Sequence, residues 1–133
     1  GQLHLVNANG TDLRRITPLE MSANGPKWSP DGKRLVFPGT PTGSGRADIY
    51  VISADGVGLT NLTAGQEGQG AGGAVNIPNV SNLAPAWSPS GDRIAFQSNR
   101  DGNWEIYVVR SDGNDLRRIT ADGAADVNPL WQP

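Results

Sequence analysis

Cysteine is absent from this 133-residue chain, and histidine occurs once, at His4. Without cysteine the chain can form no disulfide and has no thiolate chemistry. The absence does not indicate a compartment, because cysteine-free chains occur in both oxidising and reducing environments. One histidine and no cysteine also argue against a zinc site. No serine lies in a Gly-x-Ser-x-Gly motif, so no nucleophile with its base is recognisable. The sequence therefore predicts no catalytic residue and a chain that is not an enzyme by itself.

An excess of charge of one sign is also missing, as are long apolar runs. Eleven basic and thirteen acidic residues give a formal charge of −2, so no nucleic-acid partner is predicted. No apolar run approaches the roughly 18 residues that span a bilayer, and residues 1–15 carry no charged-then-apolar signal. We expect no membrane insertion, and any export signal has been removed or lies outside the chain.

Glycine and proline, in contrast, are abundant. The chain has 18 glycines and 10 prolines, and both residues break helix interiors. The glycines follow no three-residue period, and aromatic and β-branched residues recur in order, so collagen and disorder do not fit. These features predict an all-β fold in which the glycines mark turns.

Three segments of twelve residues align without gaps. They read "VNANGTDLRRIT" from Val6, "ISADGVGLTNLT" from Ile52 and "VRSDGNDLRRIT" from Val109. The Asn-Gly or Asp-Gly pair in each is typical of a tight hairpin, because these residues tolerate positive φ. Each segment is predicted to be a strand, a turn and a strand.

A second unit precedes the hairpin twice, as "WSPDGKRLVF" from Trp28 and "WSPSGDRIAF" from Trp87. Ser-Pro-x-Gly fits a type I turn, so this unit is another hairpin, and a full repeat has four short strands. Trp28, Trp87 and Trp131 share one repeat position and are expected in the core between repeats. A four-stranded unit with a tryptophan and an Asp-Gly pair, recurring about every 44 residues, is the pattern of β-propeller blades.

These motifs resemble the WD-like repeat of TolB-type β-propellers, and the likeness covers nearly the whole chain. The resemblance implies part of a six-bladed propeller, with about three blades' worth of strands and an incomplete ring in one chain. Residues 1–133 are then a single partial propeller domain. Its expected parts are the third and fourth strands of a leading blade (1–17), a blade (18–63), a blade with an expanded loop at 64–82 (64–120), and a closing first strand (121–133).

Fewer than three blades cannot close a ring without exposing sheet edges and apolar faces between blades. Two explanations stay open: the chain is a fragment whose remaining propeller lies elsewhere, or a second copy completes the ring. The predicted strands number eleven, with the last at residues 129–131.

Long loops on a rigid scaffold are common binding sites. In a four-stranded meander, the connections 38–48, 64–82 and 98–103 open on one face, which is the predicted binding face; the alternative is a glycine-rich loop without a ligand. Eight side chains there could supply hydrogen bonds, charge or an aromatic platform: Arg46, Asp48, Glu67, Asn76, Asn79, Arg100, Asp101 and Trp104. No cofactor is predicted. Calcium stays a minor alternative at "SNRDGN" and "ADGAADVN", whose spacing differs from a twelve-residue calcium loop.

The resemblance implies a non-catalytic bacterial scaffold, periplasmic or secreted, that binds a protein or peptide at this loop face. One alternative is the propeller portion of a prolyl-oligopeptidase-type serine hydrolase whose catalytic domain is absent from the chain. A further alternative is a carbohydrate-binding propeller, in which Trp104 would stack on a sugar.

Overall fold

The computed structural model describes residues 1–65 and 80–133, and the regular structure within these ranges is all β-strand. The all-β prediction is therefore confirmed. Nothing in the described ranges forms a helix that could span a membrane. The strands are β1 (His4–Leu5), β2 (Arg14–Arg15), β3 (Met21–Ala23), β4 (Lys27–Trp28), β5 (Arg34–Pro41), β6 (Asp48–Ser53), β7 (Thr60–Asn61), β8 (Asn82–Trp87), β9 (Arg93–Ser98), β10 (Glu105–Arg110) and β11 (Arg117–Arg118).

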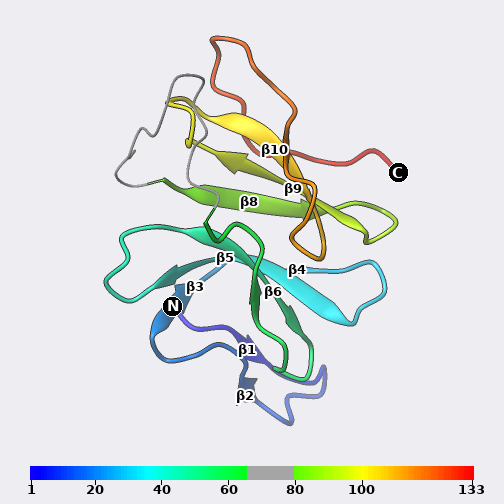
Figure 1. Cartoon of the computed structure of the whole chain (residues 1–133). Coiled ribbons are helices and arrows are strands. Elements are labelled where there is room, and N and C mark those ends of the chain that lie inside the picture. Colours follow the sequence, from blue (N-terminus) through cyan, green and yellow to red (C-terminus); the bar gives the residue numbers. More distant parts are fainter. Residues whose placement is uncertain (66–79) are drawn as a thin grey trace.

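Three antiparallel sheets follow one another in chain order (Figure 1). The first contains β1 and β2, the second runs β3-β5-β6-β7 with β4 also paired to β5, and the third runs β8-β9-β10-β11. The second and third sheets are meanders in which neighbouring strands are joined by a turn or loop. Such sheets, stacked face to face, bury apolar side chains between them.

The core lies between successive sheets. Strand β5 contributes to both interfaces because alternate side chains point to opposite faces. Leu35 and Phe37 pack toward the first sheet with Leu3 and Ile16, whereas Val36 packs toward the third sheet. The partners of Val36 across that interface are Trp87, Ile94, Phe96, Tyr107 and Val109.

The tight turns agree with the sequence. Gly10, Gly56 and Gly113 have φ of 83°, 85° and 88°, the left-handed region that the Asn-Gly and Asp-Gly pairs predict. In the Ser-Pro-x-Gly turns, the amides of Gly32 and Gly91 donate to the carbonyls of the serines three residues earlier, each at 2.9 Å. Both kinds of hairpin are therefore confirmed.

The first strand of each repeat carries a kink that the sequence did not reveal. Three residues before each repeated tryptophan, the backbone turns left-handed, with φ of 53° at Gly25, 50° at Ala84 and 54° at Asn128. A proline follows each of them. At Gly25 the kink divides the first strand into β3 and β4, and at Ala84 it produces a register shift between β8 and β9.

Two predictions need correction. Residues 129–131, predicted as a first strand, are not a strand, because no second strand lies beside them among the described residues to form a ladder. The predicted count of eleven strands matches only because the kink at Gly25 divides one strand in two. Trp28 was predicted in the core between repeats, yet it is 50% exposed while Trp87 is only 9% exposed. The preceding sheet holds only β1 and β2, so among the described residues no first strand of that sheet packs against Trp28.

Candidate functional site

The connections after β5 and β9 meet the start of β8 on one side of the molecule. Ala47 and Ser81 form a parallel bridge, and the amide of Asn82 donates to the carbonyl of Ala47 at 2.9 Å. The amide of Ser81 donates to Asn99 Oδ1 at 2.7 Å. This loop face is the one predicted to bind a ligand. Glu67, Asn76 and Asn79 lie outside the described residues.

Asp48, at the start of β6, accepts several hydrogen bonds at this face. Its Oδ1 accepts from Arg46 Nε at 3.0 Å, from Thr63 Oγ1 at 2.9 Å and from Asn82 Nδ2 at 3.1 Å. Its Oδ2 accepts from Asn61 Nδ2 at 3.0 Å. The carboxylate therefore ties β6 to the end of the second sheet and to β8 in the third.

Arg100 lies beside this carboxylate and is buried, with 4% of its surface exposed. Its Nη2 donates to Asn82 Oδ1 at 2.9 Å and its Nε to Ser98 Oγ at 3.0 Å. Its guanidinium carbon lies 4.6 Å from the centre of the Tyr107 ring. Burial lowers the pKa of Arg100, although the guanidinium keeps its charge at neutral pH.

Asp101 continues the same group of polar side chains. Its Oδ2 accepts a hydrogen bond from the hydroxyl of Tyr107 and lies 3.6 Å from Arg118 Nη1. Burial and the bond to Asp101 raise the pKa of Tyr107, which stays protonated at neutral pH. Asp101 Oδ1 is buried and has no hydrogen-bond partner among the described residues.

We call Arg46, Asp48, Asn82, Arg100 and Asp101 the loop-face cluster. The structure thus brings together four of the predicted site residues and adds Asn82, which the sequence analysis missed. The eighth candidate, Trp104, is half-buried, and its carbonyl accepts from the amide of Asp126 at 2.8 Å. Repeat alignment could not identify Asn82 as a site residue, because Asn82 lies at the end of the long junction where the repeats do not align.

Part of this arrangement recurs in every repeat. A threonine closes each aligned segment, and its hydroxyl donates to a polar side chain at the start of the third strand: Thr17 to Gln2, Thr63 to Asp48 and Thr120 to Glu105. The same hydroxyl accepts the backbone amide of the next residue along that strand, at Leu3, Ile49 and Ile106. Asp48 therefore has a structural role in the repeat, whereas Arg46, Arg100 and Asp101 are particular to this face.

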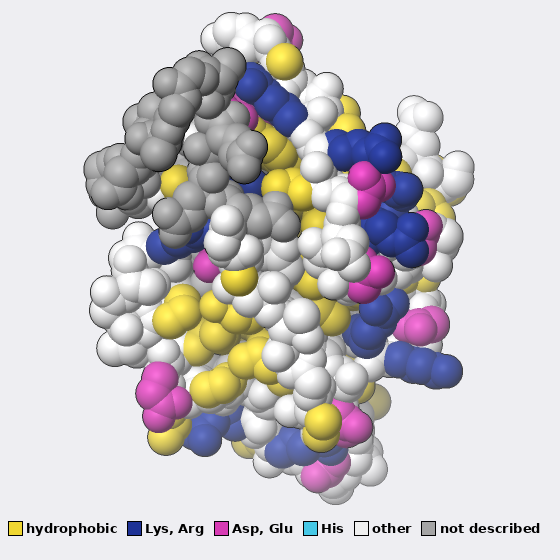
Figure 2. All heavy atoms as spheres, viewed as in Figure 1, with side chains coloured by type: hydrophobic (Ala, Val, Ile, Leu, Met, Phe, Trp, Pro, Cys, Tyr) yellow, Lys and Arg dark blue, Asp and Glu magenta, His cyan; other side chains and the backbone are white. Residues whose placement is uncertain are grey.

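The chemistry available is recognition through charge and hydrogen bonds. In the described ranges, no group of three or more His, Asp or Glu residues could hold a metal ion. His4 is exposed and lies in β1, far along the chain from the cluster. In the view of Figure 2, Lys and Arg side chains alternate with Asp and Glu along one margin, so that neither sign dominates there.

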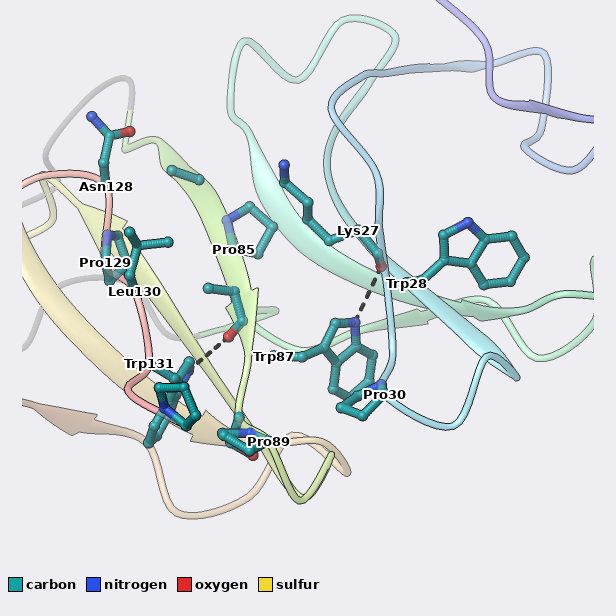
Figure 3. Close-up of a pocket in the computed structure, with 14 residues that line it drawn as sticks. Lys27, Trp28, Pro30, Pro85, Trp87, Pro89, Asn128, Pro129, Leu130 and Trp131 are labelled. Carbon is teal, nitrogen blue, oxygen red and sulfur yellow. Dashed lines mark hydrogen bonds between the residues drawn. The ribbon is translucent and has the colours of Figure 1, made fainter.

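A groove of about 620 Å³ lies on a different surface, along the first strands. Figure 3 shows its lining, with Trp28 and Trp87 on one side and Pro129, Leu130 and Trp131 on the other. Indole N–H groups are already used in its wall: Trp87 Nε1 donates to the carbonyl of Lys27 at 3.2 Å and Trp131 Nε1 to that of Ala86 at 3.0 Å. The groove is therefore walled by the contacts that join one repeat to the next.

Comparison with known proteins agrees with this architecture. The family model PD40, described as the TolB beta propeller domain, matches residues 69–133. A solved structure from Agrobacterium tumefaciens, assigned as a TolB, superposes with a TM-score of 0.75 and 32% identity over 99% of this chain and 42% of its own. The chain belongs to the TolB-like β-propeller family. Its sheets are propeller blades, and the described residues form part of a propeller ring.

Two curated relatives of the TolB-like chain are similar over most of its length. The Tol-Pal system protein TolB of Anaeromyxobacter dehalogenans is 38% identical over 106 residues, which cover 80% of this chain and 21% of that protein. An uncharacterized protein of Agrobacterium fabrum is 36% identical over 121 residues, which cover 88% of this chain and 36% of the relative. The TolB-like chain thus spans about a third or less of the curated relatives it matches.

Other solved structures share only the fold with the TolB-like chain. A puromycin-hydrolyzing peptidase of Mycobacterium tuberculosis has a TM-score of 0.63 at 20% identity, and an oligogalacturonate lyase has 0.56 at 19%. Identities this low do not transfer either activity to this chain.

Proposed function

We propose that this TolB-like chain is a non-catalytic propeller scaffold that binds a protein or peptide at the loop face formed by residues 38–48, 64–82 and 98–103. The observation that carries the proposal is Asp101 Oδ1, a buried carboxylate oxygen without a donor among the described residues. Leaving such an acceptor unpaired costs about 1–3 kcal/mol. An incoming N–H or O–H group would recover that energy only if the loop face moves to expose this oxygen.

The rest of the loop-face cluster suits such a partner. Arg100 and Asp48 are buried and mutually linked through Asn82, so the loop face is held in one arrangement before binding. Arg46, Asp101 and Trp104 are partly exposed and offer charge and an aromatic surface. A peptide would offer backbone N–H groups to the carboxylate and side chains to the aromatic surface of Trp104.

A relative is named as a Tol-Pal system protein, so the first partners to test are purified proteins of that system. Titration calorimetry should show binding that Asp101→Ala and Trp104→Ala each weaken about tenfold. The control is Arg110→Ala, an exposed position in the hairpin at the opposite end of the strands. Equal affinities for Asp101→Ala, Trp104→Ala and the control would contradict the proposal.

We further propose that residues 1–17, 18–63, 64–120 and 121–133 form part of a six-bladed ring, in the order expected from the repeat. The three sheets and their chain order support this division. We also propose a periplasmic or secreted location, which the relationship to TolB supports. Fractionation of bacteria that express the native gene would place the protein in the periplasmic or medium fraction, and recovery with cytoplasmic markers would contradict the location.

A further inference from the structure

The chain contains two Asn-Gly pairs, at Asn9-Gly10 and Asn24-Gly25, and both are exposed. In such a pair the backbone amide of the glycine can attack the side-chain amide of the asparagine, because glycine has no side chain to hinder the approach. The reaction is favoured when the asparagine side chain can rotate and the glycine amide is not held by a hydrogen bond. The two pairs differ in both respects.

The pair at Asn9-Gly10 is held in its hairpin. The amide of Gly10 donates to the carbonyl of Asn7 at 2.8 Å. Asn9 Oδ1 accepts from the amide of Thr11 at 3.0 Å and from the hydroxyl of the same residue at 2.7 Å. Three hydrogen bonds therefore hold the two reacting groups in place.

The pair at Asn24-Gly25 lies in the kink between β3 and β4, where neither reacting group is held. Within the described residues, the amide of Gly25 donates no hydrogen bond and the side chain of Asn24 makes none. A Cβ placed at Gly25 would meet no atom within 4 Å, so the space around the pair is open. Asn128 holds the equivalent of the Gly25 position, but the proline that follows it has no N–H with which to react.

This position stays accessible when the sheet in front of it is complete. The third sheet has the whole second sheet before it, and there Leu83 takes the position of the asparagine and is still partly exposed. The adjoining backbone contact is the same in both sheets. The amide of Ala23 donates to the carbonyl of Gly1 at 2.9 Å, and the amide of Asn82 donates to the carbonyl of Ala47 at the same distance. The openness of the pair therefore belongs to its place in the repeat.

We propose that Asn24 is a site of spontaneous deamidation. The nitrogen of Gly25 forms a bond to Asn24 Cγ, the bond from Cγ to Nδ2 breaks, and the side-chain nitrogen leaves as ammonia with the amide proton. Water then opens the succinimide ring at either of its carbonyl carbons, which gives aspartate or isoaspartate. Each product carries one more negative charge than the original chain, and the reaction needs no oxidant or cofactor.

The kink can accept the longer backbone of isoaspartate. The first strand advances four residues between its pairings at Ala23 and Lys27. Its partner β5 advances only three residues, from Gly39 to Val36. The kink is therefore a β-bulge with one extra residue. Isoaspartate adds one backbone atom where the strand already leaves the ladder, so the pairings on both sides keep their register.

The new charge arises at the same end of the strands as the loop-face cluster. Ala23, the neighbour of Asn24, is the repeat equivalent of Asn82 in that cluster. Deamidation therefore changes the charge of the corresponding position in the neighbouring blade. The inference does not depend on a loop-face partner, because the only reactant besides the chain is water.

Incubation of the purified native protein at mildly alkaline pH, followed by trypsin digestion and mass spectrometry, tests the proposal. Trypsin cuts after Arg15 and Lys27, so Asn24 is released in a peptide that contains no other asparagine. We expect Asn24 to convert at least about tenfold faster than Asn9, because each hydrogen bond that holds Asn9-Gly10 contributes about 1 kcal/mol. Methyl transfer by an isoaspartyl methyltransferase identifies the isoaspartate product.

Unfolding provides the matched control. In concentrated urea both pairs lose their surroundings and should convert at similar rates. In the folded protein, Asn24→Gln should suppress conversion because glutamine has to close a larger ring. Gly25→Ala should suppress it because a Cβ hinders the amide, and Ala84 shows that alanine fits this repeat position.

The folded protein and the control together decide the outcome. Asn9→Gln should leave the rate at Asn24 unchanged, and near-ultraviolet circular dichroism establishes that each variant is folded. Conversion of Asn24 no faster than that of Asn9 in the folded protein overturns the proposal, as does a peptide of residues 16–27 that stays unmodified. The same ratio of rates in the folded protein and in urea overturns it too, because the fold would then not select the site.

Discussion

Ala84 holds a backbone conformation that a side chain disfavours. Its φ is 50°, and a residue with a Cβ pays about 1 kcal/mol in this left-handed region. Its repeat equivalents are a glycine and an asparagine, the residue types that tolerate the region. The other two repeats therefore avoid this strain, because Gly25 and Asn128 hold the equivalent position.

Ala84→Gly should raise the free energy of unfolding by about 0.5–1 kcal/mol, because relief of strain exceeds the added freedom of the unfolded chain. Urea denaturation measures the change. Ala86→Gly, two residues along the same strand and without positive φ, should instead destabilise by about 0.5–1 kcal/mol. Two destabilised variants would show that Ala84 is not strained.

Glu105 links stability to pH at the residue scale. Its side chain is buried, accepts from Thr120 Oγ1 at 2.6 Å and from Arg118 Nη2 at 2.8 Å. The hydrogen bond from Thr120, followed by Arg118, holds the pKa of this carboxyl below its ordinary value. Because the pKa of Glu105 is lower in the folded chain, the ionised carboxylate stabilises the fold at pH values above its ordinary pKa. This contribution is lost as the pH falls through the folded-state pKa.

Glu105→Gln should therefore lower stability at pH 7 and make stability fall less steeply between about pH 5 and pH 2 than in the wild-type chain. Urea midpoints across this range measure both effects. Other acids with lowered pKa, including Asp31 and Asp92, contribute equally to both proteins, so the difference in slope isolates Glu105. Parallel pH curves for the two proteins would refute the linkage.

At the scale of the elements, Arg100 joins the end of β9 to the start of β8. Removing a buried charged partner leaves Asn82 Oδ1 without its donor, so Arg100→Ala should cost about 3 kcal/mol. Arg110→Ala, at an exposed arginine 3.6 Å from Asp112, should change stability by less than about 0.5 kcal/mol. Urea denaturation measures the loss of stability in each variant. Similar losses would show that Arg100 does not stabilise the junction of β9 and β8.

The elements show what the sequence could predict. The hairpins at Gly56 and Gly113 followed from local chemistry, because Asp-Gly pairs favour one backbone conformation wherever they occur. The division between β3 and β4 and the missing strand at 129–131 did not follow, because strands depend on partners from elsewhere in the chain. The same reason explains the candidate site: Arg100 lies on a predictable loop, but its link to Asp48 passes through Asn82, after a junction that does not align with the repeat.

At the scale of the whole molecule, stability depends on contacts between blades. Trp87→Phe removes an indole N–H that joins two blades and leaves the Lys27 carbonyl without that donor, so it should cost about 1 kcal/mol. Trp28→Phe, at the equivalent position without an indole partner in the described chain, should cost less than about 0.5 kcal/mol. Thermal or urea unfolding measures the loss of stability caused by each substitution. Equal losses would show that the indole N–H of Trp87 does not contribute to joining the blades.

Both indole contacts between blades, from Trp87 and from Trp131, run from a later blade to the one before it. The series of contacts between blades therefore has a direction, and its two ends are not equivalent. Blades related by a two-fold axis would place two donors, or two acceptors, against each other. Any completion of the ring, from within one chain or from another, must therefore preserve this single sense of rotation.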